Sequence, residues 1–255
     1  RLGRKRLQGK ALFPHEFLLD LLLERLVRQK IQARLGGNLK YFISGGAALN
    51  PEIGSFFMAL GVKLLQGYGQ TEASPVISAN RPGKIKIETV GPPVAGVEVR
   101  FADDGEILVR GDLLMKGYWR DDHSTAAAIR DGWLYTGDIG SCDDDGYITI
   151  TGRKKEIIVN SGGENIVPSR VEALLTIEPE IEQALVDGDR RPWLAAVIVP
   201  SAEARATAAS DEALKLLIAE TVERANSRLS QIERVRRFII ADEGFTTENS
   251  QLTAT

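Results

Sequence analysis

The chain has 255 residues, of which 43% are hydrophobic and 26% charged, a composition typical of a globular protein with one large or two modest domains. Its 32 basic and 35 acidic residues give a net charge of −3. This balance argues against nucleic acid as a partner, because no strong positive field is available to neutralise phosphates. The single cysteine, Cys142, excludes an internal disulfide and a multi-cysteine metal site, so the simplest expectation is a reducing compartment, the cytoplasm.

The N-terminal segment combines a basic run with a helical pattern. Arg1–Lys10 is rich in Arg and Lys, and the segment from Pro14 to Leu35 has apolar residues at helical spacing. We expect this helix to pack on a core. The alternative is peripheral contact with an anionic membrane through Arg1–Leu35, because basic runs and amphipathic helices both favour lipid surfaces.

No apolar run has the length that a bilayer crossing requires, and no signal peptide is recognisable. The start at Arg1 rather than Met indicates a fragment of a longer protein.

A strand–helix–strand unit follows. Leu39–Ile43 and Val62–Leu65 are short apolar runs typical of strands, and Pro51–Leu60 between them is typical of a helix. This order predicts a βαβ unit with a parallel sheet. Two loops, Ser44–Ala48 and Gly67–Glu72, follow the carboxyl ends of these strands, where open α/β sheets bind their ligands.

The second half of the chain changes character twice. Short strands separated by Asp-Asp-Gly turns predict a small antiparallel β subdomain at about residues 84–152. A mixed pattern of strands and helices then predicts a compact α+β unit. We therefore expect part of a large domain over residues 1–153 and a separate small domain over residues 154–255. The expected elements are Val97–Phe101, Glu106–Val109, Tyr147–Ile150, Val167–Ile177, Ile181–Val186, Leu194–Val199, Ser210–Leu229 and Arg237–Ile240.

The sequence Gly-Tyr-Gly-Gln-Thr-Glu that begins at Gly67 combines residue types suited to a nucleotide. Gly67 and Gly69 allow the backbone to approach a ligand closely, and Tyr68 offers a flat face for adenine. Thr71 supplies a hydroxyl for a phosphate oxygen, and Glu72 a carboxylate suited to Mg²⁺. The alternative is a glycine-rich turn with an incidental helix cap.

Two further segments carry residues suited to the same ligand. Asp138, in Tyr-Thr-Gly-Asp, can accept both ribose hydroxyls, and Arg153 is placed in the sequence to grip the same ribose. The small residues Gly46, Ala47 and Ala48 leave room for a planar base. Taken alone, each has a structural alternative: a turn aspartate for Asp138, a surface salt bridge for Arg153, and close packing for the small residues. Their joint occurrence favours one nucleotide site.

In order and spacing, these segments resemble the signatures of the adenylate-forming (AMP-binding) superfamily, and within it the long-chain fatty acyl-CoA ligases. The resemblance extends from about Gly36 to Thr255. It implies part of a large α/β domain, with a parallel βαβ sheet and a small antiparallel β-barrel, hinged to a small C-terminal α+β domain. It also implies ATP- and Mg²⁺-dependent activation of a carboxylic acid, preferably a long-chain fatty acid, to an acyl-adenylate that is transferred to coenzyme A.

The resemblance also implies roles for individual residues. Lys155 corresponds to the hinge between the domains, and Gly162 and Gly163 to a loop that lines the pantetheine path. A pyrophosphate-binding loop is expected upstream of the chain and a catalytic lysine just beyond it, so we expect this span alone to adenylate poorly. The implied nucleotide-binding residues are Gly46, Ala47, Ala48, Gly67, Tyr68, Gly69, Gln70, Thr71, Asp138, Ile150 and Arg153, with Thr71 and Glu72 in catalysis and Glu72 on the metal.

Two other functions remain open at this point. The first is an adenylating enzyme that loads a carrier protein or stops at acyl-AMP, and the second is a non-catalytic acyl- or nucleotide-binding module that associates with membranes. A long acyl chain is favoured by the resemblance and by Gly69, where a side chain is expected to narrow an acyl channel. A kinase or dehydrogenase is disfavoured, because neither a Gly-x-Gly-x-x-Gly nor a Gly-Lys-Ser/Thr loop occurs.

Overall fold

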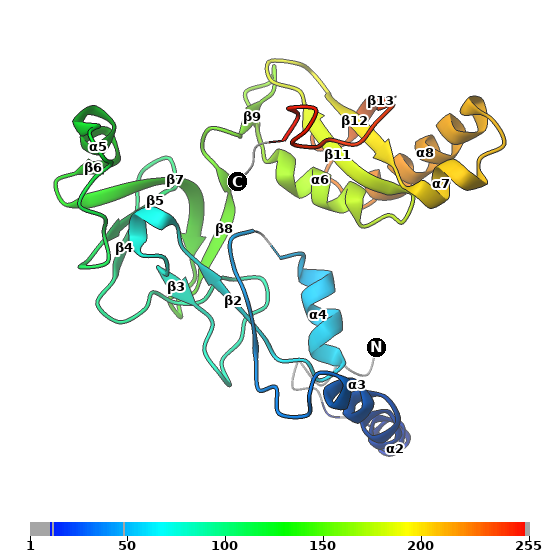
Figure 1. Cartoon of the computed structure of the whole chain (residues 1–255), viewed down its shortest axis with the longest axis horizontal. Helices are drawn as coiled ribbons and strands as arrows, with labels where there is room; N and C mark the ends of the chain where they lie inside the picture. Colours follow the sequence, from blue (N-terminus) through cyan, green and yellow to red (C-terminus); the bar gives the residue numbers. More distant parts are fainter. Residues whose placement is uncertain (1–10, 12, 48, 253–255) are drawn as a thin grey trace. The chain divides into compact units, whose positions relative to one another are not determined.

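The computed structural model describes residues 11, 13–47 and 49–252. The chain divides into two compact units, Arg1–Thr151 and Gly152–Thr255, which are coloured blue to green and green to red in Figure 1. The expectations for Arg1–Lys10 and for Ala48 lie outside the described residues.

The first unit begins with a continuous helical segment made of α2 (Pro14–Leu23), the π-helical turn η1 (Glu24–Arg28) and α3 (Gln29–Arg34). The helix was predicted, but the expectation that its apolar face packs on a core is wrong for the described residues. Asp20 and Arg28 are its buried residues, while most of its leucines are exposed. The polar face packs inward because the Arg28 guanidinium donates to Asp20 Oδ1 at 2.7 Å and to the Ala59 carbonyl at 2.9 Å.

The predicted βαβ unit follows. Strands β1 (Phe42–Ser44) and β2 (Leu64–Tyr68) pair in parallel, with Phe42 opposite Leu64, and α4 (Pro51–Ala59) connects them. Both strands begin and end later in the sequence than predicted, since Leu39–Ile43 and Val62–Leu65 were expected. Strand β2 continues through Tyr68 because β3 (Ser78–Ala79) pairs antiparallel with its end.

The predicted antiparallel subdomain is a five-stranded sheet in the order β4-β5-β7-β6, with β8 paired to β7. Its longest strand, β7, contains the Tyr-Thr-Gly-Asp segment and was not predicted as a strand. The apolar core of the first unit lies between this sheet and the end of β2, and it includes Tyr68, Ile77, Ile107, Leu134 and Ile148. The elements are β4 (Glu98–Phe101), β5 (Glu106–Arg110), α5 (Asp122–Ala128), β6 (Ile129–Arg130), β7 (Trp133–Cys142) and β8 (Ile148–Arg153).

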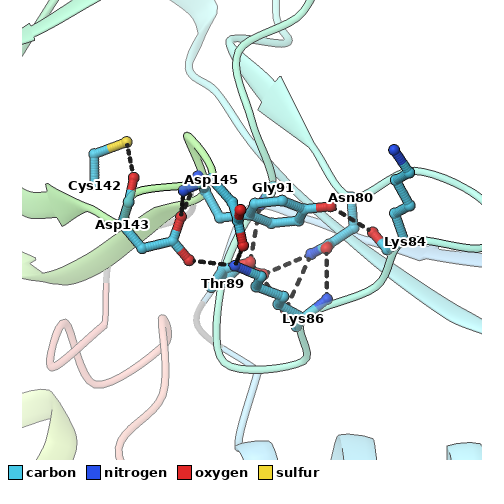
Figure 2. A network of polar contacts seen from close by, with 9 residues as sticks. Asn80, Lys84, Lys86, Thr89, Gly91, Cys142, Asp143 and Asp145 are labelled. Carbon is cyan, nitrogen blue, oxygen red and sulfur yellow. Dashed lines mark hydrogen bonds and ion pairs between the residues drawn. The ribbon is translucent and has the colours of Figure 1, made fainter.

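A polar network fastens the long connection before β4 to the turn between β7 and β8 (Figure 2). The Lys86 ammonium lies 2.6 Å from both Asp143 Oδ2 and Asp145 Oδ2, and 4.4 Å from the centroid of the Tyr147 ring. The Asn80 side chain closes the connection on itself by accepting from the Lys86 amide at 3.0 Å. This network holds residues 80–91 against the β7–β8 turn.

The neighbouring thiol of Cys142 lies in surroundings that do not favour a reactive thiolate. Partial desolvation and, second, the charge of Asp143 raise the pKa of Cys142. The group therefore stays a thiol at neutral pH, which agrees with the acidic turn in which it lies.

The second unit is the predicted α+β unit. Strands β11, β12 and β13 form one sheet, antiparallel between β11 and β12 and parallel between β12 and β13. Helix α8 starts at its N-cap Ser210, whose hydroxyl accepts from the Ala213 amide, and packs Ile218 and Val222 into a closed apolar core. The elements are β9 (Ile158–Val159), β10 (Asn165–Ile166), α6 (Pro168–Thr176), β11 (Ile181–Asp187), β12 (Leu194–Pro200), α7 (Ala202–Thr207), α8 (Asp211–Asn226) and β13 (Val235–Ile240).

Candidate functional site

Two of the predicted site residues meet in the first unit. The Tyr68 hydroxyl, at the end of β2, donates to Asp138 Oδ2 of β7 at 2.6 Å. Both side chains are buried, with exposed fractions of 8% and 7%. A buried carboxylate that accepts a short hydrogen bond is held in one orientation. The contact therefore joins two segments that lie 70 residues apart in the sequence and fixes the carboxylate expected to hold the ribose.

A distortion of β7 aims Asp138 toward Tyr68. Glu106 pairs with Ile139 and Leu108 with Tyr135, so three residues of β7 lie opposite the single residue between them on β5. Gly137 has φ +73°, a conformation that other residues rarely adopt, and its amide donates to the buried Glu106 carboxylate at 2.9 Å. Bulges of this kind re-aim side chains beside active sites. Glu106 is a structural residue of the site that sequence reasoning missed.

The turn after β2 brings the next motif residues together. A Cβ atom at Gly69 would overlap the carbonyl oxygen of Pro75, so glycine is required there by the turn itself. This requirement is a second reason for glycine at this position, and the expected role of Gly69 beside an acyl channel stays a prediction. Thr71 begins a 3₁₀ turn that Ser74 ends at φ +43°, and the Thr71 side chain is exposed. The Nε2 atom of Gln70 is buried and has no hydrogen-bond partner among the described residues.

The predicted metal ligand, Glu72, is held by a residue that sequence reasoning missed. The Tyr118 hydroxyl donates to Glu72 Oε1 at 2.8 Å, and the Glu72 carbonyl accepts from the Met115 amide at 2.8 Å. Burial, followed by this hydrogen bond, raises the pKa of Tyr118, so the phenol remains a donor at neutral pH. No spacing in the sequence connects Tyr118 with Glu72, because the contact depends on how the strands pair.

The loop after β1 lies beside the loop after β2. Ser44 pairs with Gln66, and a Cβ atom at Gly45 would lie 3.4 Å from the Gly67 carbonyl oxygen. Gly46 has φ +85° with open space where a Cβ would stand, and Ala47 follows it. The structure thus brings the two predicted loops to one edge of the parallel sheet.

The remaining predicted residues belong to β8 or to the second unit. Ile150 on β8 packs against the core of the first unit that contains Tyr68. Arg153 ends β8 with an exposed side chain, and Lys155 is exposed in the turn that follows, where the Glu156 amide donates to the Arg153 carbonyl at 3.0 Å. The structure therefore assigns Arg153 and Lys155 to an accessible segment directly after the division between the units.

In the second unit, the loop with Gly162 and Gly163 is closed by one side chain. Asn160 Oδ1 accepts from the Gly162 amide at 2.8 Å and from the Glu164 amide at 3.0 Å. Gly163 has φ +81° and open space at its Cβ position. The loop is a preformed turn in which two glycines leave the backbone accessible.

A basic and aromatic surface adjoins this glycine loop. The Ser161 amide donates to the Arg191 carbonyl at 3.0 Å, which brings the exposed Arg190–Arg191 turn beside the loop. Two residues further on, the Trp193 ring lies 4.7 Å below the guanidinium of Arg237 from β13. Flat rings and guanidinium groups suit an adenine with phosphates. Sequence reasoning missed Trp193 and Arg237, because strand register alone brings them together.

The residues of the first unit fit a nucleotide and Mg²⁺. The buried, unpartnered Gln70 Nε2 offers a donor, Asp138 offers a fixed carboxylate, and exposed Thr71 offers a hydroxyl. Mg²⁺ is commonly held by one or two carboxylates together with substrate phosphates, and Glu72 supplies one such carboxylate.

Known structures that resemble this chain also bind a nucleotide. The A domain of carboxylic acid reductase from Segniliparus rugosus, solved with AMP and a co-purified carboxylic acid, superposes with a TM-score of 0.73 at 26% identity. The superposition covers 98% of this chain and 40% of that one. The fold is thus that of the adenylation domains of adenylate-forming enzymes.

Sequence comparison narrows the assignment. Residues 16–119 match the AMP-binding enzyme family, and residues 155–252 match the AMP-binding enzyme C-terminal domain. Long-chain-fatty-acid–CoA ligase FadD15 of Mycobacterium bovis is 42% identical over 92% of this chain and 42% of the relative. Long-chain-fatty-acid–CoA ligase 5 of Mus musculus is 32% identical over 92% of this chain and 39% of the relative. The chain belongs to the AMP-binding enzyme family, and it spans less than half the length of these relatives.

Within the part of the chain that the structure describes, no helix combines the length and the apolar character needed to cross a membrane.

Proposed function

We propose that this chain is part of an ATP-dependent acid–thiol ligase that activates a long-chain fatty acid as an acyl-adenylate and transfers the acyl group to coenzyme A. The observation that carries the proposal is the buried contact between Tyr68 and Asp138, which joins two of the nucleotide motifs in one site. The similarity to relatives named long-chain-fatty-acid–CoA ligases supports the choice of acid.

The first reaction needs a fixed nucleotide and an accessible α-phosphate. A carboxylate oxygen of the acid attacks the α-phosphorus, the bond to the bridging oxygen breaks, and pyrophosphate leaves. Asp138 would hold the ribose in the orientation that Tyr68 sets, and the Thr71 hydroxyl would donate to an α-phosphate oxygen. Mg²⁺ held by Glu72 would neutralise phosphate charge, with Tyr118 keeping the Glu72 carboxylate in place.

The second reaction needs a binding path for a thiol. The thiol sulfur attacks the acyl carbon, the bond from that carbon to the phosphate oxygen breaks, and AMP leaves. Gly162 and Gly163 would line the pantetheine arm, while Trp193 and Arg237 would bind the phosphoadenosine end of coenzyme A. Lys155 would serve as the hinge that exchanges the groups used in the two reactions. A carrier protein lacks the phosphoadenosine end, so this surface favours coenzyme A as the acceptor.

The test is acid-dependent release of AMP by the chain completed with the regions that its relatives possess. Acetate, octanoate, palmitate and benzoate are compared, with and without coenzyme A. We expect palmitate- and CoA-dependent release that falls at least tenfold in Asp138→Ala. Release with acetate or benzoate instead would contradict the substrate, and silence with every acid from a folded protein would contradict the ligase.

The acceptor is tested with a second variant pair. Arg237→Ala should raise the KM for coenzyme A several-fold and leave the KM for ATP unchanged, because its guanidinium lies on Trp193 in the second unit. Arg205→Ala, which changes another exposed arginine of the same unit, is the control. An unchanged KM for coenzyme A in Arg237→Ala would contradict the role of this surface, and an enzyme that free coenzyme A does not saturate would favour carrier loading or arrest at acyl-AMP.

We also propose that the 255-residue span alone binds nucleotide and does not adenylate efficiently. A pyrophosphate-binding loop and a catalytic lysine are expected outside the span, and loss of a positive group that stabilises developing charge costs several kcal/mol. Calorimetric binding of AMP together with ATP turnover measures both parts. Turnover at ordinary enzyme rates by this span would refute the second part.

A further inference from the structure

The bulge in β7 is held to β5 by two side chains that act on its backbone. The Glu106 carboxylate accepts from the Gly137 amide at 2.9 Å, and Glu106 is only 5% exposed. The Thr136 hydroxyl donates to the Ile107 carbonyl at 2.7 Å and accepts from the Asp138 amide at 3.1 Å. Two backbone amides in the part of β7 that leaves the ladder are therefore satisfied by side chains.

These contacts restrain Asp138 at the end opposite to its contact with Tyr68. The Tyr68 hydroxyl donates to Asp138 Oδ2 at 2.6 Å and restrains the tip of the side chain. Glu106 and Thr136 restrain the backbone from which that side chain projects. A hydrogen bond at the tip alone leaves the backbone free to shift, and a shift of about 1 Å in a functional group can cost about 100-fold in rate. The orientation of the carboxylate therefore depends on both ends.

We propose that Glu106 and Thr136 are positioning residues for ribose recognition, because they aim Asp138 so that it accepts both vicinal hydroxyls of a ribonucleotide. The inference rests on the proposed function, in which Asp138 holds the ribose. A carboxylate has lone pairs for several donors, so it accepts two ribose hydroxyls together with the Tyr68 hydroxyl only when it faces the sugar. Without the contacts to β5, the carboxylate loses this orientation, and the site distinguishes a ribonucleotide poorly from its deoxy analogues.

Positioning differs from a purely structural role of Glu106 and Thr136 in one measurable quantity. A loss of stability lowers the fraction of folded protein and weakens the binding of every nucleotide by the same factor. A loss of orientation weakens the binding of AMP, but it has little effect on a nucleotide that lacks the hydroxyl concerned. The ratio of the two dissociation constants, deoxynucleotide to AMP, therefore separates the two roles.

The test is calorimetric titration with AMP, 2′-deoxyAMP and 3′-deoxyAMP of the chain completed with the regions that its relatives possess. Glu106→Ala removes the acceptor of the Gly137 amide, whereas Glu106→Gln keeps an oxygen that can accept from it. Thr136→Val removes the bridging hydroxyl, whereas Thr136→Ser keeps it. Thermal unfolding shows that each variant is folded, and Thr136→Val carries the test if Glu106→Ala does not fold.

The matched control is Thr151→Val on β8. The Thr151 hydroxyl donates to the Ile139 carbonyl of β7 at 3.2 Å, directly beyond the bulge. The control thus removes a hydrogen bond to the same strand and leaves the contacts of Glu106 and Thr136 intact.

For the wild-type chain, we expect each missing ribose hydroxyl to raise the dissociation constant about tenfold, because a hydrogen bond to a charged group is lost. In Glu106→Ala and in Thr136→Val this ratio should fall by about threefold or more, because the hydroxyls then lose a well-aligned acceptor. Glu106→Gln, Thr136→Ser and Thr151→Val should keep the ratio of the wild-type chain. The measurement depends on binding alone, so it does not require catalytic turnover.

Failure of this proposal and failure of the proposed function give different results. A wild-type chain that prefers AMP, together with undiminished ratios in folded Glu106→Ala and Thr136→Val, would overturn the positioning role alone. An equal fall of the ratio in Thr151→Val would overturn it too, since any disturbance of β7 would then suffice. A ratio near one in the wild-type chain, or no binding of AMP, would overturn both this proposal and the ribose contact of Asp138.

Discussion

Removal of one hydroxyl group, in Tyr68→Phe, tests the contact on which the nucleotide site depends. The Tyr68 hydroxyl lies 2.6 Å from Asp138 Oδ2, and both side chains are buried, so water cannot readily replace the lost donor. The ring itself stays in the apolar core with Ile77 and Ile148. The substitution therefore removes a hydrogen bond without opening a cavity.

The expected cost follows from the character of this hydrogen bond. A hydrogen bond to a charged group contributes about 1.5–3 kcal/mol to stability, and the free-energy cost of leaving a buried acceptor without its donor is similar. We expect Tyr68→Phe to lower the free energy of unfolding of the first unit by about 2 kcal/mol. With a urea m-value of about 2 kcal/mol per molar, the midpoint moves by about 1 M.

The assay is the urea dependence of amide hydrogen exchange in β7, which reports on the first unit separately from the second. Tyr41→Phe is the matched control, because the Tyr41 hydroxyl makes no hydrogen bond within the described residues. Calorimetric titration with AMP should show weaker binding by Tyr68→Phe and unchanged binding by the control. Equal midpoints for the two variants would refute the reasoning, since the buried contact would then contribute nothing.

Two other substitutions test the surroundings of the site. Gly69→Ala should destabilise the first unit by about 3 kcal/mol, because the added Cβ would overlap the carbonyl of Pro75. Gly67→Ala should cost less, because the nearest atom to its Cβ would lie 3.3 Å away. Thermal unfolding measures both variants, and a lower melting temperature for Gly67→Ala than for Gly69→Ala would be inconsistent with this turn. Lys86 lowers the pKa of Asp143 by a hydrogen bond, so the pair stabilises the folded state above the ordinary pKa of the carboxyl and loses this effect as the pH falls below about 4. Lys86→Met should remove that part of the pH dependence of the melting temperature, and an unchanged profile between pH 7 and pH 3 would count against the role of the network.

Much of the fold could be predicted because hydrophobic spacing is a local property. The βαβ unit around α4, the antiparallel strands after residue 84 and the α+β unit with α8 all follow from such spacing. The order of the glycine-rich and acidic motifs predicted the residues that now meet as Tyr68 and Asp138. The chain divides into compact units after Thr151, whereas the domain boundary at residues 153–154 stays a prediction.

The rest depended on contacts that spacing does not record. The periodicity of residues 14–35 identifies an apolar face but says nothing about what covers it, and Arg28 turned the polar face inward. Strand β7 was missed because Gly137 and its polar neighbours look like a turn, although Glu106 and Ile107 on β5 hold them in a sheet. The contact between Tyr118 and Glu72 arises only when the chain has folded.

The bulge in β7 also bears on how the site can change without damage to the sheet. Three residues face Ile107 where one would complete a regular ladder, so β7 carries a surplus of two residues. Side chains alternate along a strand, and an even surplus lets the ladder resume in the same phase, so that Tyr135 and Ile139 stand on the same face. A change in length by a single residue would turn Ile139 and the rest of β7 to the opposite face unless a further bulge absorbed it. The segment between Tyr135 and Ile139 can therefore leave the ladder and present Asp138 to Tyr68, while the strand on either side of it keeps its phase.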